Sequence, residues 1–327
     1  MTKGNWPIGI RDVLEARRRI RPYIRATPLR RYAPLDAAVG GDLRVWVKHE
    51  NHNPTNAFKA RNAISVLTAL PDEVRRRGIV AASRGNWGQG LAWAGALFGS
   101  PIVVCVPVGN NPEKNEAMRG FGAEVIEEGR DYDESVEVAL RILGERGLTM
   151  VHATNDPLVT AGAATLTLEI LEERPDVEAI VVAVGGGSQA VGALTVARAL
   201  APGVKVYAVQ AEGASAIHDS WHAGRMLTRD SADTFADGLA TRQPYEGTFW
   251  ALREGLAGFV TVTEGELADA VRLLLSTTHN LAEGAGAAGL AGVRRLTGEL
   301  ARKDVAVILS GGNMDAATLR RVMTHQI

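Results

Sequence analysis

Cysteine is nearly absent from this sequence, which has one such residue among 327. Cys105 has no second thiol to pair with, so a small secreted fold held together by disulfides is excluded. Cys105 also lies inside an apolar run, where we expect a buried strand residue. Aromatic residues make up only 5% of the chain, whereas glycine is frequent, with 36 residues. This composition is typical of helices packed closely on a sheet.

A strong charge of either sign is also missing. The 36 lysine and arginine residues almost balance the 37 aspartate and glutamate residues, so no overall field would draw the protein to nucleic acid or to an anionic membrane. No apolar stretch reaches the roughly 20 residues that a membrane-spanning helix needs, and the first residues lack a signal-peptide core. We therefore expect a cytoplasmic protein with a small-molecule substrate and with neither a membrane nor a nucleic acid as partner.

Short strand-like runs alternate with helical stretches along most of the chain. The expected strands cover residues 44–48, 79–82, 102–106, 124–127, 149–151, 179–184, 204–209, 258–262 and 305–309. Several of them are apolar throughout rather than at alternate positions, as expected when helices cover both faces of a parallel sheet. The pattern predicts an α/β fold, and the length corresponds to about two domains.

A glycine-rich turn after one of these strands is a candidate phosphate site. Its residues are Gly185, Gly186, Gly187 and Ser188. Consecutive backbone N–H groups and the partial positive charge of a helix N-terminus both favour a phosphate at such a turn. The spacing Gly185-x-Gly187-x-x-Ala190 also fits a relaxed dinucleotide fingerprint, with Glu212 near the end of the next strand. A nicotinamide-dependent oxidoreductase is therefore an alternative from a different class.

Lys59 directly follows Ala57 and Phe58 at the start of a predicted helix. Apolar surroundings would lower the pKa of this amine and leave it nucleophilic enough to form a Schiff base with an aldehyde cofactor. A single lysine on a helix is more often solvated, so the motifs around it decide between the two interpretations.

Those motifs resemble the ones found in pyridoxal-phosphate enzymes of fold type II. The segment Lys48-His-Glu-Asn-His-Asn-Pro-Thr-Asn-Ala-Phe-Lys-Ala-Arg-Asn62 is similar to the lysine motif of the threonine and serine dehydratases and the serine racemases. Further motifs follow in family order at Ser83-Arg-Gly-Asn-Trp-Gly-Gln89, Gly185 to Ser188, Glu283 to Gly286 and Ser310-Gly-Gly-Asn313. The resemblance implies a tryptophan-synthase-β-like α/β fold with two open twisted sheets flanked by helices.

The resemblance also implies pyridoxal 5'-phosphate as the cofactor. It makes Lys59 the catalytic residue, which binds the cofactor and afterwards moves the Cα proton. The other residues assigned to the cofactor are Phe58, Asn86, Gly185, Gly186, Gly187, Ser188, Glu283 and Ser310. The residues assigned to the substrate are Ser83, Arg84, Gly85, Asn86 and Trp87. Because the neutral hydroxyl of Ser310 cannot hold the ring nitrogen as a stable cation, elimination is favoured over transamination.

We therefore expect β-elimination of water from a β-hydroxy amino acid of the threonine or serine type, giving a 2-oxo acid and ammonia. A β-replacement or a different ammonia-lyase reaction is the alternative within the family. The resemblance further implies a homodimer whose chains have a large domain formed by residues 1–71 and 148–327. Residues 72–147 would form a small domain that closes over the substrate.

The chain departs from the family pattern at Arg84 and Trp87, where a small residue and a histidine are usual. Racemases of the family use a serine hydroxyl at the position of Arg84, and a guanidinium cannot shuttle that proton, so we expect little racemase activity. Either Arg84 binds a second carboxylate or another acceptor on the substrate side chain, or it points to solvent. Gln210 and Ala216 stand where many relatives carry acidic metal ligands, so we expect no metal.

Overall fold

The computed structural model describes residues 6–327 and places their strands in two sheets. The order of the six-stranded sheet is β1-β2-β10-β7-β8-β9, and that of the four-stranded sheet is β5-β4-β3-β6. The larger sheet contains β1 (Leu29–Arg31), β2 (Arg44–His49), β7 (Ala179–Ala183), β8 (Lys205–Ala211), β9 (Gly258–Val262) and β10 (Asp304–Leu309). The smaller sheet contains β3 (Ile79–Ala82), β4 (Ile102–Val106), β5 (Glu124–Glu127) and β6 (Thr149–Met150).

All strand pairs in the described residues are parallel except β1 with β2. The strands β3, β4, β5 and β9 have the bounds that the sequence predicts. The edge strand β1 is an element that the sequence analysis missed, because its three residues include two exposed arginines and form no recognisable pattern. The predicted α/β fold with two helix-flanked sheets is confirmed.

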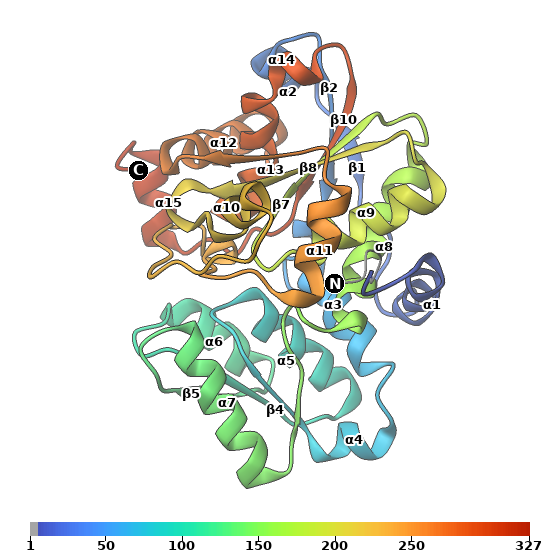
Figure 1. Ribbon diagram of the computed structural model, residues 1–327. Helices are drawn as coiled ribbons and strands as arrows, with labels where there is room; N and C mark the ends of the chain where they lie inside the picture. Colours follow the sequence, from blue (N-terminus) through green and yellow to red (C-terminus); the bar gives the residue numbers. More distant parts are fainter. Residues whose placement is uncertain (1–5) are drawn as a thin grey trace.

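Helices fill the connections between the parallel strands (Figure 1). Those before β7 are α1 (Ile10–Ile20), α2 (Ala33–Val39), α3 (Lys59–Leu67), α4 (Asp72–Arg77), α5 (Asn86–Phe98), α6 (Pro112–Gly120), α7 (Tyr132–Arg146) and α8 (Pro157–Glu173). Those after it are α9 (Ser188–Leu200), α10 (Ala216–Ala223), α11 (Glu246–Gly255), α12 (Glu264–Thr278), α13 (Gly284–Arg295), α14 (Thr297–Leu300) and α15 (Ala316–Met323). Short 3-10 turns occupy Glu50–His52, Glu212–Ala214 and Asp237–Leu239. None of the helices within residues 6–327 is long and apolar enough to cross a membrane.

The larger sheet separates two apolar clusters, one on each of its faces. Successive residues of a strand point to opposite faces of the sheet, so Ile180 and Val182 of β7 join one apolar cluster, which includes residues of α8 and α9. Val181 joins a second cluster, which includes residues of α12 and α13. The first cluster continues through α3 and α5 to one face of the smaller sheet, and α7 packs against the other face, where Cys105 lies. Burial raises the pKa of the Cys105 thiol to about 11, as expected for a buried strand residue.

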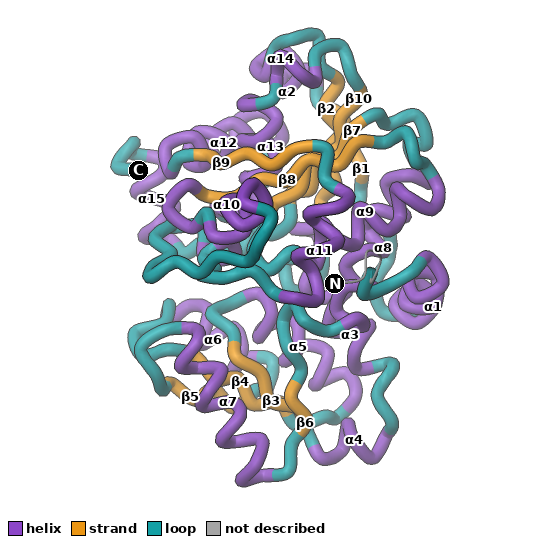
Figure 2. Tube along the Cα trace, viewed as in Figure 1, coloured by secondary structure: helices purple, strands orange, loops and turns teal. Residues whose placement is uncertain are grey.

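The two ends of the chain meet in the larger sheet. Figure 1 shows β2, from the blue N-terminal part, beside the red β10, while Figure 2 shows the four strands of the smaller sheet as a separate group. The smaller sheet uses residues 79–150, so it extends past residue 147 through β6. The division into two domains that move relative to each other remains a prediction.

Candidate active site

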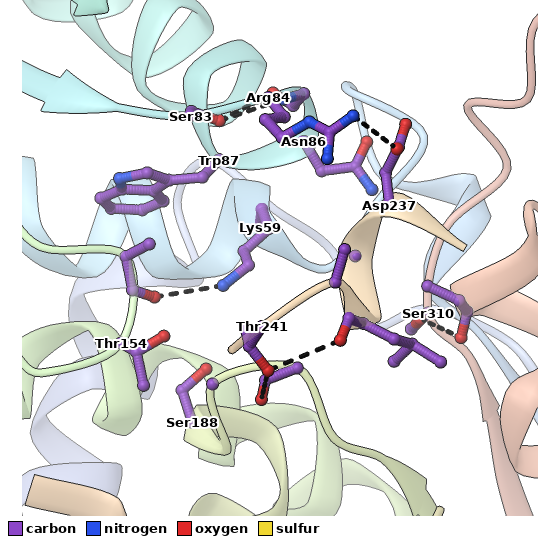
Figure 3. A pocket seen from close by; sticks show the side chains of 18 of the residues that line it. Lys59, Ser83, Arg84, Asn86, Trp87, Thr154, Ser188, Asp237, Thr241 and Ser310 are labelled. Carbon is purple, nitrogen blue, oxygen red and sulfur yellow. Dashed lines mark hydrogen bonds and ion pairs between the residues drawn. The ribbon is translucent and has the colours of Figure 1, made fainter. Parts of the chain in front are cut away.

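A cavity of about 160 Å³ lies where strand ends from both sheets meet. The chain leaves β3, β7 and β10 at their carboxyl ends and turns directly into three of the predicted motifs, as is usual for ligand sites in open parallel sheets. Its lining includes all the residues that the sequence assigns to the site: Phe58, Lys59, Ser83, Arg84, Gly85, Asn86, Trp87, Gly185, Gly186, Gly187, Ser188, Glu283 and Ser310. The structure thus brings together segments from five separate parts of the sequence (Figure 3).

Lys59 is the first residue of α3 and extends its amine into this cavity (Figure 3). Its Nζ lies 5.0 Å from the centroid of the Phe58 ring and 5.8 Å from that of the Trp87 ring, and it donates a hydrogen bond of 3.2 Å to the carbonyl of Ala153. Burial lowers the pKa of Lys59 to about 8, because an ammonium group in apolar surroundings loses hydration. A usable fraction of this amine is therefore neutral and nucleophilic near neutral pH.

The close contact of two helices fixes the start of α3. A Cβ atom on Gly90 of α5 would lie 2.8 Å from the backbone oxygen of Lys59, so only glycine allows α5 to approach so closely. On the opposite side, Ala57 pairs with Gly311 in an isolated bridge, and the N–H of Phe58 donates to the carbonyl of Ser310 at 3.0 Å. The lysine motif and the serine motif are therefore held together by their backbones.

The glycine-rich turn between β7 and α9 forms a cradle of backbone donors. Within residues 6–327, the N–H groups of Gly186, Gly187 and Ser188 have no hydrogen-bond partner. A Cβ atom on Gly186 would lie 2.0 Å from Thr154 Oγ1, so a larger residue would clash. The adjoining Gln189 is buried with both amide atoms unpartnered within the described residues. Unpartnered donors at a helix N-terminus fit a phosphate group.

A network of amides and carboxyl groups lines another wall. The Asn86 Nδ2 donates to Glu283, and the Asn313 Nδ2 donates to the Asn86 Oδ1 at 2.7 Å. Burial raises the pKa of Glu283. The buried Ser310 donates only a long hydrogen bond, 3.3 Å, to the carbonyl of Ala285, so its hydroxyl can serve a better acceptor. The Asn86 amide and the Ser310 hydroxyl fit the polar edges of a pyridine ring.

The start of α5 also offers free backbone donors and is a second candidate site for an anion. The Ser83 hydroxyl accepts hydrogen bonds from the N–H groups of Gly85 at 3.1 Å and Gly88 at 2.8 Å. In the part of the chain that the structure describes, the N–H groups of Asn86 and Trp87 have no partner. The first N–H groups of a helix, at its positive end, bind a carboxylate readily.

Some residues of the cavity were missed by the sequence analysis. They include Lys114, Tyr132, Thr154, Gln189, Asp237, Thr241 and Tyr245. The Lys114 Nζ lies 2.6 Å from Asp237 Oδ2. Burial by itself would lower the pKa of Lys114, but the charges of Glu283 and Asp237 outweigh it and raise that pKa. The Asp237-Gly238 dipeptide marks a turn, but no local signal places either Lys114 or Asp237 at the cavity.

The structure can be compared with the nicotinamide alternative and with possible metal ligands. Glu212, which a dinucleotide site requires near the glycine turn, is exposed and does not line the cavity. Among the described residues, no group of three or more histidine, cysteine, aspartate or glutamate side chains is arranged to hold a metal ion. Gln210 is buried, and its Oε1 accepts a hydrogen bond from the N–H of His218 at 3.0 Å.

The chain is similar to known proteins along nearly its whole length. The family model described as pyridoxal-phosphate dependent enzyme matches residues 20–311. The L-threonine ammonia-lyase of Thermotoga maritima is 39% identical over 316 residues, which cover 97% of this chain and 78% of that protein. A solved threonine deaminase, from T.th., is 37% identical with a TM-score of 0.88, and the match covers 94% of this chain and 99% of that one. The maize serine racemase structure is 29% identical with a TM-score of 0.92 and covers 98% of each chain.

Proposed function

Because the chain belongs to the family of pyridoxal-phosphate dependent enzymes, we propose that it eliminates water from a β-hydroxy amino acid of the threonine or serine type and releases a 2-oxo acid and ammonia. The observation that carries this proposal is a reactive lysine, Lys59, that shares one cavity with two separate sets of free backbone donors within residues 6–327. The relatives named threonine ammonia-lyase and threonine deaminase support the same reaction.

The cavity fits pyridoxal 5'-phosphate residue by residue. Lys59 would hold the aldehyde carbon, the cradle of Gly185 to Ser188 the phosphate, and Asn86 and Ser310 the polar ring edges, with Phe58 beside the ring. When bound, this cofactor supplies an electron sink for the bonds at Cα. The nicotinamide alternative gives no role to Lys59 or Ser310, so we do not favour it.

Separate groups of the chain hold the substrate and transfer its proton. The free N–H groups of Asn86 and Trp87 hold the α-carboxylate of the substrate, which fixes the Cα–H bond relative to Lys59. The neutral Nζ of Lys59 takes the Cα proton as general base, and its lowered pKa of about 8 suits that role. The apolar rings of Phe58 and Trp87 keep water away from this amine.

The geometry also supports elimination rather than racemisation. Racemisation needs a proton donor on the face of the substrate opposite to Lys59, and the family position for that donor is occupied by Arg84. A guanidinium is a poor proton shuttle. We therefore propose that racemase activity is at most a minor side reaction.

The test is to load the protein with pyridoxal phosphate and to measure 2-oxo acid and ammonia released from threonine and serine. We expect turnover in the wild type and its loss in Lys59→Ala, whereas the surface variant Arg141→Ala keeps it. Borohydride reduction followed by peptide mass spectrometry should locate the cofactor on Lys59. Full activity of Lys59→Ala, or release of replacement products without any 2-oxo acid, would contradict the proposal.

The assembly and the location follow from the same family expectation. We propose a homodimer in the cytoplasm, in which residues 72–147 close over the substrate held by residues 1–71 and 148–327. Sedimentation of the purified protein tests the dimer, and small-angle scattering with and without a non-reactive substrate analogue tests the closure.

A further inference from the structure

The side chain of Arg84 lies at one end of the active-site cavity and has no short ion pair among the described residues. Arg84 lines this cavity and also an adjoining one of about 320 Å³. Its Nε is buried and has no hydrogen-bond partner within residues 6–327, and 41% of its side chain is exposed. The side chain therefore neither points freely to solvent nor has its donors satisfied by the described part of the protein.

The nearest carboxylate is already engaged by another cation. Asp237 Oδ1 lies 3.4 Å from the Arg84 Nη2, whereas Asp237 Oδ2 accepts a hydrogen bond of 2.6 Å from the Lys114 Nζ. Glu283, another carboxyl group that lines this end of the cavity, accepts a hydrogen bond from the Asn86 amide. One carboxylate thus faces two cations, and the guanidinium of Arg84 is the more loosely held of the two.

Arg84 also lies beside the backbone donors that we propose for the α-carboxylate of the substrate. It precedes Gly85 and Asn86 directly, so its backbone belongs to the loop that offers N–H groups to the α-carboxylate. Figure 3 shows Lys59 between Ser188, in the phosphate cradle, and Arg84 with Asp237 at the other end of the site. A substrate bound between Lys59 and this loop would therefore lie next to the residue that carries the guanidinium.

We propose that Arg84 binds a second carboxylate, carried by the β-carbon of the substrate, and that β-hydroxy amino diacids such as 3-hydroxyaspartate are the preferred substrates. This inference rests on the proposed β-elimination. A guanidinium binds a carboxylate through two parallel hydrogen bonds, which would satisfy the buried Nε. The methyl group of threonine and the hydrogen of serine offer no such acceptor.

The reaction stays the same for the diacid. The Cα–H and Cβ–OH bonds break and release water, and the released enamine takes up water and loses ammonia. The net change is therefore loss of ammonia from 3-hydroxyaspartate to give the four-carbon 2-oxo diacid, without oxidation or reduction. Only the group on Cβ, and therefore the contact with Arg84, differs from the reaction of threonine.

The test compares threonine with each stereoisomer of 3-hydroxyaspartate in the loaded wild type, Arg84→Ala and Arg84→Lys. We expect the wild type to have the higher kcat/KM on a 3-hydroxyaspartate isomer. Arg84→Ala should lower that value about ten- to hundredfold, as for a lost charge-assisted hydrogen bond, and lower that of threonine by a clearly smaller factor. Arg84→Lys, which keeps the charge but not the fork, should be intermediate. Arg141→Ala, on the exposed side of α7, is the matched control and should leave both values unchanged.

A binding measurement separates this inference from the proposed function. Calorimetry with succinate and butyrate, which do not react, should show a similar loss of succinate affinity in Arg84→Ala and no change for butyrate. Equal losses on threonine and 3-hydroxyaspartate, no turnover of any 3-hydroxyaspartate isomer beside active threonine turnover, or unchanged succinate binding would each overturn the role of Arg84. Absence of 2-oxo acid from every substrate would instead overturn the proposed β-elimination.

Discussion

Lys59 shows at the scale of one residue how surroundings set reactivity. Burial and the loss of hydration that comes with it lower its pKa to about 8, from an ordinary value of 10.5. Because only the neutral amine attacks an aldehyde, the rate at which the cofactor-free protein captures pyridoxal phosphate should rise with pH and level off above about 8. Stopped-flow absorbance over a pH series measures this rate.

The matched variant for this prediction is Phe58→Ser, which gives water access to the same amine. We expect its rate profile to move to higher pH, because a better hydrated ammonium group is harder to deprotonate. A wild-type midpoint close to the ordinary lysine pKa of 10.5 would show that the amine is solvated and would contradict a lowered pKa.

Gly186, in the phosphate cradle, has no room for a side chain. A Cβ atom there would lie 2.0 Å from Thr154 Oγ1, so Gly186→Ala must displace the cradle or Thr154. We expect weaker binding of pyridoxal phosphate, by about tenfold or more, with little change in the far-ultraviolet circular dichroism. The double variant with Thr154→Ala removes the Oγ1 and Cγ2 atoms, which would lie 2.0 Å and 2.6 Å from the new Cβ atom, and should recover part of the affinity. Unchanged affinity in Gly186→Ala would show that the cradle does not hold the phosphate.

At the scale of elements, a buried charge network anchors α3, the helix that begins with Lys59. Arg61 of α3 pairs with Glu50 at 2.7 Å and with Glu169 of α8 at 2.6 Å, and Lys48 of β2 also pairs with Glu169 at 2.6 Å. Burial by itself would raise the pKa of Glu50, but the charge of Arg61 outweighs it and holds that pKa below its ordinary 4.5. The network therefore orders the helix only while both partners are charged.

Removal of Arg61 should be strongly destabilising. Arg61→Met leaves the carboxylate of Glu50 buried without its main partner, which costs about 3–5 kcal/mol, as measured by urea unfolding. Since the folded pKa of Glu50 is lowered, wild-type stability from this group is present above pH 4.5 and is lost as the pH falls below it. In Arg61→Met the sign reverses, because protonation relieves the unpaired carboxylate.

The double variant Arg61→Met with Glu50→Gln should recover part of the lost stability, since it removes the uncompensated charge. The surface variant Arg141→Met, whose ion pairs are exposed, should cost less than about 1 kcal/mol. Equal losses in Arg61→Met and Arg141→Met would contradict the structural importance of the network.

At the scale of the whole molecule, two ion-pair clusters connect the segments that carry the two sheets. One is Asp237 with Lys114 and Arg84, and the other is Arg242 with Asp131 and Asp133. Asp237 and Arg242 lie in the same segment between α10 and α11. These ion pairs join the large domain to the proposed small domain, so they would stabilise its closed position.

Arg242→Gln should therefore weaken closure without touching the chemistry. Its partners are partly exposed, so we expect a rise in KM of about two- to fivefold at low salt with a smaller change in kcat. This difference should disappear at high ionic strength, where exposed charges are screened. Arg141→Gln, which removes an arginine whose ion pairs stay within the small-sheet segment, is the control. A salt-independent loss of kcat would argue for a role of Arg242 in catalysis rather than in closure.

The fold class, most of the strand positions and the contiguous parts of the site can be predicted from the amino-acid sequence. Apolar runs indicate buried parallel strands, and a motif such as Gly185 to Ser188 carries its own turn, its donors and the helix that follows. Such features depend on neighbours along the chain, so they are visible without a structure. The family resemblance then placed the separate motifs in one cavity.

Which charged residues from distant parts of the sequence come into contact depends on the tertiary structure. Asn86 and Glu283 are 197 positions apart, and the pairing of Lys114 with Asp237, like that of Arg61 with Glu169, joins segments more than 100 residues apart. No local periodicity encodes these contacts, because they form only when distant segments of the chain pack against each other in the folded protein. For that reason the state of Arg84, held loosely beside an already engaged carboxylate, could not be inferred from the sequence.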